Sequence, residues 1–194
     1  MSQLTPNEGS LLGFLTVVES SEWGCTGGYL LISGSGRPVE FHCTAPVRVT
    51  RAQEILYGPT LRPILFGEQM GRALLDKARR KPACICTDLA EILALRPMVD
   101  LPVVMVRPSA AGNAAVAPQP HDDTCPAVLG WRLGQPCLVG PATVTALDRF
   151  AEDVEVLRGW LAEQGWGGEL TEPFERVREA LHEAARMAAA VAAR

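Results

Sequence analysis

Three carboxylates in this chain stand at positions where acidic side chains could hold a metal ion. Glu19 directly follows an apolar run at residues 11–18, and Asp88 directly follows a second run at residues 83–87. Glu68 interrupts an apolar stripe with helical spacing. A carboxylate that faces an apolar core is costly unless it is paired, protonated or bound to metal. If the two runs form parallel neighbouring strands, the three acids converge and could bind Mg²⁺ or Mn²⁺ for phosphodiester hydrolysis.

Each of these acids also has a simpler structural interpretation. Asp88 could cap a helix at residues 89–95, because aspartate is favoured at the N-cap. Glu68 stands four residues before Arg72, which is the spacing of an ion pair along a helix surface. Glu19 could be a surface residue at the end of a strand. The sequence leaves these alternatives open.

Cysteine and histidine offer a second set of possible metal ligands. Cys84 and Cys86 share one face of a strand, whereas His42 and Cys43 point to opposite faces. No CxxC pair accompanies them, so core packing is favoured over zinc binding. The signatures of phosphate-binding loops, dinucleotide-binding turns, zinc proteases and serine hydrolases are absent from the sequence.

Basic residues concentrate in residues 46–82, although the chain as a whole has a formal net charge of -4. The net charge gives no global attraction to nucleic acid or anionic lipid, but a local cluster could contact phosphate groups. The candidates for nucleic-acid contact are Arg48, Arg51, Arg62, Arg72, Arg79, Arg80 and Lys81. A solvated helix face is the alternative interpretation of such a charge run.

The elements that must position these side chains follow from the hydrophobic pattern. The predicted strands comprise residues 11–18, 29–33, 39–43, 83–87 and 101–106. The predicted helices comprise a short one from Arg51, after a capping box at Thr50 and Gln53, and longer ones at residues 63–80 and 89–95. Short glycine-rich links predict that the first three strands form an antiparallel meander. The last two strands flank a helix, which predicts a parallel, right-handed unit and an α/β fold.

The C-terminal part of the sequence predicts a helical hairpin. Apolar residues recur at spacings of three and four in residues 147–161 and again in residues 174–191. Two such helices joined by a glycine-rich turn are expected to pack antiparallel. The expected organisation is a core domain at residues 1–106, an Ala/Pro-rich linker at 107–124, and a C-terminal unit at 125–194. That unit begins with a weak β-hairpin within residues 127–139.

The order of three antiparallel strands, helix, strand, helix and strand resembles the RNase H-like fold. The motif Pro63-Ile-Leu-Phe-Gly-Glu68, followed by Lys81-Pro-Ala-Cys-Ile-Cys-Thr-Asp88, is similar to the endonuclease V branch of that fold over about residues 11–106. A helical Glu and a strand-end Asp bind the catalytic metal in that family. The resemblance therefore implies that Glu68 and Asp88 are metal ligands in a Mg- or Mn-dependent hydrolase. The family also has an Asp within the first strand, whereas residues 11–18 contain no acid and Glu19 comes later.

The function favoured by the sequence is a non-catalytic α/β module that binds a protein partner or self-associates through residues 145–194. The narrow seam that includes Ala184 and Ala188 would permit close approach of another helix. The alternative is a metal-dependent nuclease or nucleic-acid-binding protein of the endonuclease V type. A polar start and the absence of about 20 consecutive apolar residues predict a cytoplasmic protein without a membrane segment.

Overall fold

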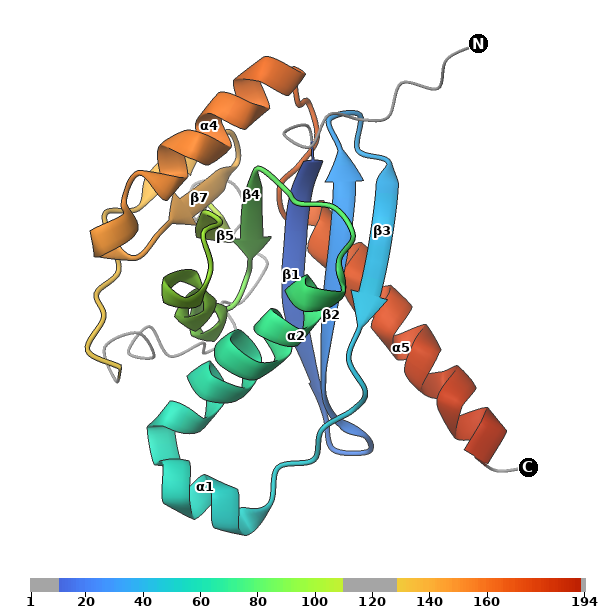
Figure 1. Cartoon of the computed structure of the whole chain (residues 1–194). Helices are drawn as coiled ribbons and strands as arrows, with labels where there is room; N and C mark the ends of the chain where they lie inside the picture. Colours follow the sequence, from blue (N-terminus) through green and yellow to red (C-terminus); the bar gives the residue numbers. More distant parts are fainter. Residues whose placement is uncertain (1–10, 110–128, 193–194) are drawn as a thin grey trace.

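The computed structural model of this chain describes residues 11–109 and 129–192, with side chains described through residue 188. Its core is a seven-stranded mixed sheet with the strand order β3-β2-β1-β4-β5-β7-β6 (Figure 1). The strands are β1 (Leu11–Ser20), β2 (Gly24–Ser33), β3 (Pro38–Cys43), β4 (Cys84–Thr87), β5 (Val103–Pro108), β6 (Cys137–Val139) and β7 (Ala142–Thr145).

Strand β1 connects the antiparallel part of the sheet to its parallel part. It pairs antiparallel with β2, which pairs antiparallel with β3, and these pairings form the expected meander. On its other side β1 pairs parallel with β4, with Leu12 opposite Cys84, and β4 pairs parallel with β5. The expected RNase H-like order of strands is therefore confirmed.

Helical segments cover both faces of the sheet (Figure 1). One face is covered by η2 (Pro63–Gly71), α2 (Arg72–Lys77) and η3 (Ala90–Met98). The opposite face is covered by α4 (Asp153–Gln164) and α5 (Glu172–Ala192). Because strand side chains alternate between faces, Leu15 and Ile85 meet the first set of helices, whereas Phe14 and Cys86 meet the second.

The predicted capping box is present at the start of α1 (Arg51–Tyr57). The Gln53 backbone amide donates to Thr50 Oγ1 at 3.3 Å, and the Thr50 amide donates to Gln53 Oε1 at 2.9 Å. The helix ends at Gly58, whose φ of 51° favours glycine, and the short 3₁₀ segment η1 (Gly58–Thr60) follows. Local sequence signals therefore define both ends of this helix.

The long helix predicted at residues 63–80 has a different geometry from the one expected. Residues Pro63–Gly71 form the π-helix η2, and only Arg72–Lys77 form the α-helix α2. Phe66, Met70 and Leu74 are the residues that this segment buries most fully. Of the predicted stripe, Gly71 is buried, whereas Glu68 and its apolar neighbours Leu61, Ile64 and Leu75 are partly buried. The helix expected at 89–95 is the 3₁₀ segment η3.

The C-terminal strands extend the same sheet. The β-hairpin is formed by β6 and β7, later in the chain than the predicted 127–139. Strand β7 pairs antiparallel with β5, with Met105 opposite Thr145, so both halves of the chain contribute to one sheet. Residues 110–124 of the expected linker lie outside the described residues.

Helices α4 and α5 form the expected C-terminal pair, and their apolar seams face the sheet. The ring of Phe174 on α5 meets Phe14 on β1 edge to face, with 5.3 Å between centroids. A Cβ atom at Gly28 of β2 would lie only 2.5 Å from Val177 Cγ1, so glycine permits the close approach of α5. Among the helices described, none has the length and apolar character needed to cross a membrane.

Candidate functional site

Asp88 lies directly after β4 and is paired with an arginine from the far end of the chain. Its carboxylate accepts a hydrogen bond from Arg178 of α5, and its side chain is only 14% exposed. Asp88 therefore faces α5, on the opposite side of the sheet from η2. It does not cap the following helix, because the N-cap of η3 is Leu89, whose amide donates to Thr87 Oγ1 at 3.2 Å.

The position beside Asp88 on β1 is occupied by Thr16. Leu15 pairs with Thr87 in the parallel register, so the next residue along each strand brings Thr16 beside Asp88. Thr16 is 1% exposed, and its Oγ1 has no hydrogen-bond partner among the described residues. An uncharged hydroxyl therefore stands where a first-strand acid would face Asp88.

Glu19 lies at the carboxyl end of β1 and belongs to a different cluster. Its carboxylate pairs with Arg62 at 2.7 Å, and Arg62 also pairs with Glu91 of η3 at 2.9 Å. The side chain of Glu91 is 5% exposed, whereas Glu19 and Arg62 are about half exposed. One guanidinium thus neutralises two carboxylates that come from a strand end and from η3.

Glu68 lies on η2 and is partly exposed. It has no ion pair with any residue that the structure describes, and the predicted partner Arg72 pairs instead with Asp76 at 3.2 Å. The segment that carries Glu68, η2, covers one face of the sheet, whereas the α5 helix that pairs with Asp88 covers the other. The structure does not bring Glu19, Glu68 and Asp88 together.

The predicted Mg²⁺ or Mn²⁺ site is accordingly not assembled. Within residues 11–109 and 129–192, no group of three or more His, Cys, Asp or Glu side chains is placed to hold a metal ion. Such cations require several oxygen ligands at about 2.1 Å. At Asp88 and Glu19, the guanidinium groups of Arg178 and Arg62 supply the positive charge that a metal ion would otherwise supply. These residues therefore do not fit the metal that the resemblance implies.

Cys84 and Cys86 pack in the core as predicted, whereas Cys43 is exposed and His42 is partly buried. Cys84 and Cys86 are fully buried on the face that carries α4 and α5, and burial raises the pKa of the Cys84 thiol well above its ordinary value. His42 pairs with Glu40 on the same strand at 3.1 Å. No zinc cluster forms from the residues described here.

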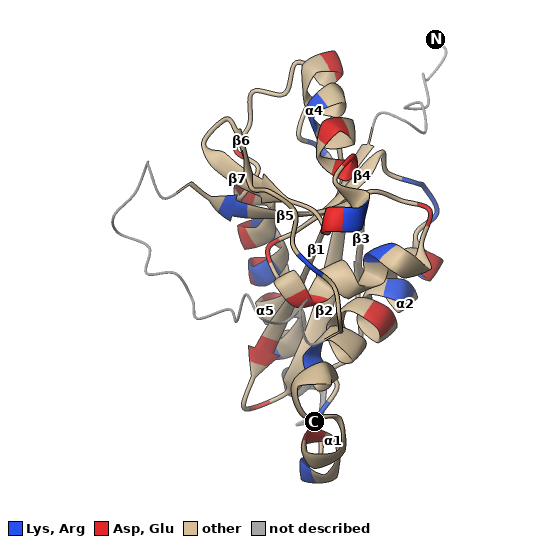
Figure 2. Cartoon of the chain, turned by 90° about the vertical axis from the view of Figure 1, so that its left-hand side faces the viewer, with Lys and Arg blue, Asp and Glu red and all other residues tan. Residues whose placement is uncertain are grey.

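Most of the predicted nucleic-acid contacts are already engaged. Arg51 pairs with Glu54 at 2.9 Å, and the guanidinium of Arg48 donates to the backbone oxygen of Glu22. Together with Arg62 and Arg72, these arginines have partners within the molecule. Figure 2 shows the same mixing of charge, with Asp and Glu interspersed among Lys and Arg along the helices.

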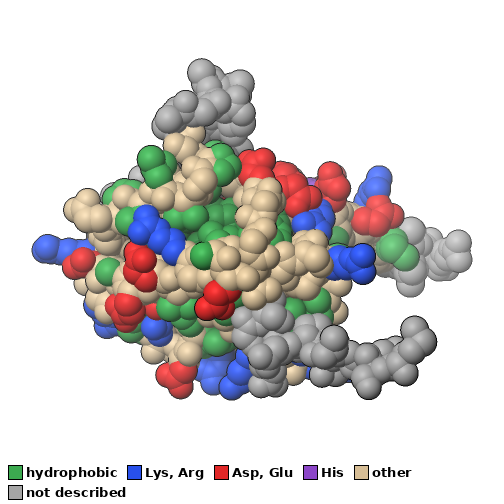
Figure 3. Space-filling view, turned by 90° about the horizontal axis from the view of Figure 1, so that it is seen from above, with side chains coloured by type: hydrophobic (Ala, Val, Ile, Leu, Met, Phe, Trp, Pro, Cys, Tyr) green, Lys and Arg blue, Asp and Glu red, His purple; other side chains and the backbone are tan. Residues whose placement is uncertain are grey.

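Arg79, Arg80 and Lys81 differ from the other candidates. None of the three forms a side-chain ion pair with a described residue, and the nearest acid, Glu40, accepts the backbone amide of Arg79 at 3.0 Å. Burial would raise the pKa of Glu40, but the hydrogen bonds from Arg79 and His42, together with the charges of His42 and Arg80, outweigh burial and lower it. These cations precede β4, at the opposite end of the sheet from Arg62. Figure 3 views that end, with Lys and Arg mostly toward its rim.

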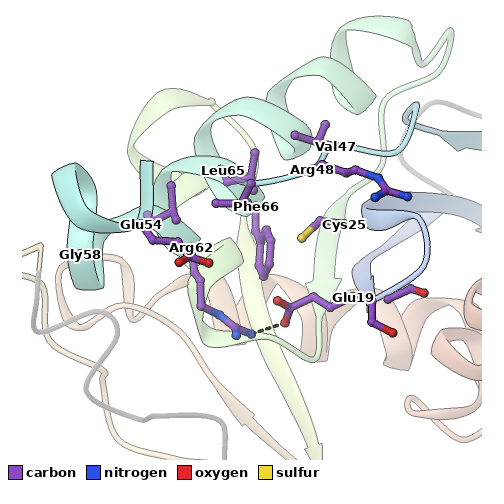
Figure 4. A pocket seen from close by; sticks show the side chains of 14 residues that line it. Glu19, Cys25, Val47, Arg48, Glu54, Gly58, Arg62, Leu65 and Phe66 are labelled. Atoms are coloured by element: carbon purple, nitrogen blue, oxygen red, sulfur yellow. Dashed lines mark ion pairs between the residues drawn. The ribbon is translucent and has the colours of Figure 1, made fainter. Parts of the chain in front are cut away.

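A pocket of about 660 Å³ opens at the carboxyl end of β1 (Figure 4). Its charged lining consists of Glu19, Arg48, Glu54 and Arg62, and its apolar lining includes Phe66. The thiol of Cys25 also lines it, and burial together with the charge of Glu19 raises the pKa of that thiol. The lining of the pocket therefore mixes polar and apolar side chains, and its acids and arginines balance in charge.

Comparison with known proteins gives no family for this chain, and two solved structures show a distant likeness. No protein-family model and no curated protein matches this chain. Human endonuclease V is similar in structure, with a TM-score of 0.43 and 15% identity over 93% of this chain and 86% of that chain. Endonuclease V from Ciona intestinalis, solved in complex with DNA, has a TM-score of 0.39 and 10% identity over 75% of each chain.

Sequence reasoning missed the two residues that change the site most, Arg178 and Glu91. Glu91 had a detectable signal, because it is an acid within the apolar run of residues 89–95. Arg178 had no such signal. It lies 90 residues after Asp88, on a helix for which the sequence showed only the apolar seam.

Proposed function

We propose that this chain is an RNase H-like module that binds nucleic acid without cleaving it. The observation that carries the proposal is the charge arrangement of the candidate residues. Arginines neutralise Asp88 and Glu19, whereas Arg79, Arg80 and Lys81 form no side-chain ion pair with a described residue, and Glu40 is the acid on which the charge of Arg80 acts.

The absence of cleavage follows from the pairing of Asp88. A carboxylate that accepts a hydrogen bond from a guanidinium is already compensated, so a divalent cation would have to displace Arg178. Thr16 beside it supplies no second negative charge. The hydrolysis implied by the resemblance lacks the oxygen ligands that it needs.

Nucleic-acid binding is supported by the position of the three cations. They stand in the short connection between α2 and β4, and Arg79 and Lys81 are exposed. Phosphate groups release counterions when they are neutralised by Lys or Arg, so a local cluster can bind even though the net charge is -4. Such binding is independent of nucleotide sequence and is weakened by salt.

The test measures the fluorescence anisotropy of labelled single-stranded and double-stranded oligonucleotides over a series of salt concentrations. Replacement of Arg79, Arg80 and Lys81 by alanine is expected to reduce affinity by at least about tenfold at low salt. The slope of log affinity against log salt should fall by about two to three, since each phosphate contact contributes roughly 0.7 to 0.9. The matched control replaces Arg48, Arg51 and Arg72 by alanine and should change the slope little.

Three results would contradict the proposal. The first is equal loss of binding in both triple variants, and the second is no binding at low salt. The third is cleavage of an oligonucleotide in the presence of Mn²⁺ that disappears in Glu68→Gln and Asp88→Asn, which would establish the nuclease alternative.

A protein partner or self-association through residues 145–194 is the second candidate function. It is favoured by the end of α5, where Ala184, Met187 and Ala188 are exposed and Met187 is 63% exposed. Earlier in α5, Phe174, Val177 and Leu181 are buried on the sheet. Met187→Glu therefore tests this surface without removing the core. We also propose the cytoplasmic location that the sequence predicts.

A further inference from the structure

Strand β3 forms one edge of the sheet and has a neighbouring strand on one side only. In the order of the described strands it is outermost, and it pairs with β2 alone (Figure 1). A free edge presents backbone N–H and C=O groups to which another strand can bind, and proteins usually cover such an edge or guard it with charge. The six residues of β3 therefore form a surface on which an extended segment can add to the sheet.

The register shows which backbone groups of β3 point outward. The Thr44 amide donates to the Gly27 oxygen at 2.9 Å, so the chain enters β3 from a hydrogen-bonded pair. Hydrogen-bonded and non-hydrogen-bonded pairs alternate along an antiparallel ladder, so the backbone groups of Phe41 and Cys43 point away from β2. Among the described residues, none forms a hydrogen bond with these outward groups.

The side chains of Phe41 and Cys43 are also accessible. Phe41 is 40% exposed, and Cys43 is exposed. Phe41 lies opposite Leu30, which belongs to the core on the side of α4 and α5. An added strand would place every second side chain beside this ring, because directly opposite residues of paired strands contact each other. Apolar side chains are favoured in that row.

Cations that have no acidic partner lie toward the other face of the same edge. Glu40 lies opposite Leu31 on the side of η2 and α2, and it accepts the Arg79 amide at 3.0 Å. Arg80 is close enough for its charge to lower the pKa of Glu40, and Lys77 lines one groove with Cys43. In the part of the chain that the structure describes, Lys77, Arg79 and Arg80 form no side-chain ion pair.

The chemistry of the edge selects among possible occupants. Three cations beside one acid favour acidic side chains in the second row of an added strand. A second copy that paired through its own β3 would bring the same cations to the same edge, and like charges repel. A nucleic acid lacks the alternating amide and carbonyl groups that the edge of a sheet binds.

We propose that the β3 edge binds an extended segment of a partner protein, in which acidic and apolar residues alternate, as an additional strand. The outward groups of Phe41 and Cys43 bond to its backbone. Its apolar side chains cover the Phe41 ring, and its acidic side chains meet Lys77, Arg79 and Arg80. The inference does not rest on nucleic-acid binding, although the two ligands share two arginines and should compete.

A labelled peptide of about eight residues that alternates glutamate and valine tests the inference against the full chain. Its fluorescence anisotropy should rise to saturation, and a peptide with lysine in place of glutamate should bind at least about tenfold more weakly. N-methylation of the valine amides in one peptide, and of the glutamate amides in another, blocks one edge of the peptide each time. Only one of the two should lose affinity, by at least about tenfold, because only one edge faces β3.

Phe41→Pro is the matching change in the protein, because it removes an outward N–H that makes no bond to β2. It should weaken peptide binding by at least about tenfold, whereas the control Phe41→Val, which keeps the N–H, should weaken it less. Oligonucleotide binding should be unchanged in Phe41→Pro, so the two proposals can fail separately. Hydrogen exchange in the wild type needs no variant, and the bound peptide should slow exchange at the Phe41 and Cys43 amides.

The inference would be overturned by the absence of saturable peptide binding, by equal loss with both methylated peptides, or by unchanged exchange at the Phe41 and Cys43 amides. Equal or tighter binding of the lysine peptide would also overturn it. Slowed exchange at high concentration of the protein alone would place a second copy on this edge. Slowed exchange with an oligonucleotide but not with the peptide would place nucleic acid there, and either result would overturn the inference.

Discussion

A carboxylate that is mostly buried needs a proton, a metal or a cationic side chain, and Asp88 has the guanidinium of Arg178. The pair joins the end of β4 to α5, so it fixes the helix over the strand as well as compensating the charge. Thr16 stands beside it without a charge. At the scale of single residues, Asp88, which the resemblance implies as a metal ligand, is paired with Arg178 instead.

Arg178→Ala should lower the free energy of unfolding by about 2 kcal/mol, because it leaves the Asp88 carboxylate largely buried without that guanidinium. Asp88→Ala should also destabilise the protein. The double variant should be less destabilised than the two losses added together, by more than about 0.5 kcal/mol. Urea unfolding of the four proteins measures this coupling.

Arg186→Ala is the control on the same helix, because Arg186 pairs with Glu183 where both are exposed. Its effect should stay within about 0.5 kcal/mol. Additive losses at Asp88 and Arg178 would mean that the two residues do not act as a pair.

At the scale of elements, the contact between η2 and η3 is as close as backbones allow. A Cβ atom at Gly67 would lie 2.7 Å from Ala94 Cβ and 2.8 Å from the backbone oxygen of Glu91. Glycine at this position lets the two segments touch, and this contact holds Glu91 against Arg62. The site at the carboxyl end of β1 therefore depends on the packing of two irregular helices.

Gly67→Ala should destabilise the protein by about 1–3 kcal/mol, since η2 and η3 must separate to admit the methyl group. Gly159→Ala on α4 is the matched control, because a Cβ there meets no atom within 4 Å. That control should stabilise the protein by about 0.4–1 kcal/mol. Thermal unfolding measures both, and equal effects would show that the contact is not tight.

Local patterns predicted the elements whose causes are local. An apolar run predicted β1, alternation predicted β3, and Thr50 with Gln53 predicted the start of α1. Only residues 29–33 of β2 were predicted, because the glycines before them indicated a turn, whereas the strand begins at Gly24. The orientation of Glu68 could not be predicted, because the π-helical turns of η2 depend on packing against η3. The pairing of β7 with β5, and of Arg178 with Asp88, joins segments far apart in the sequence. No local pattern specifies such contacts.

At the scale of the whole molecule, the two ends of the sheet differ in character. The carboxyl ends of β1 and β4 carry the pocket, the charge-balanced residues around Arg62, and the apolar helix α1. The opposite end carries Arg79, Arg80 and Lys81, just before β4. The proposed contact with phosphate therefore lies at the end of the sheet away from the pocket.

The central claim is that arginines, rather than a divalent metal, compensate the acids at Asp88 and Glu19. Thermal unfolding during a titration with Mn²⁺ tests it most directly, because a metal that binds the folded state raises the unfolding temperature in a saturable way. The account predicts no saturable rise beyond that given by sodium chloride of equal ionic strength. A saturable rise that disappears in Asp88→Asn and Glu68→Gln, but persists in Glu22→Gln, would contradict it.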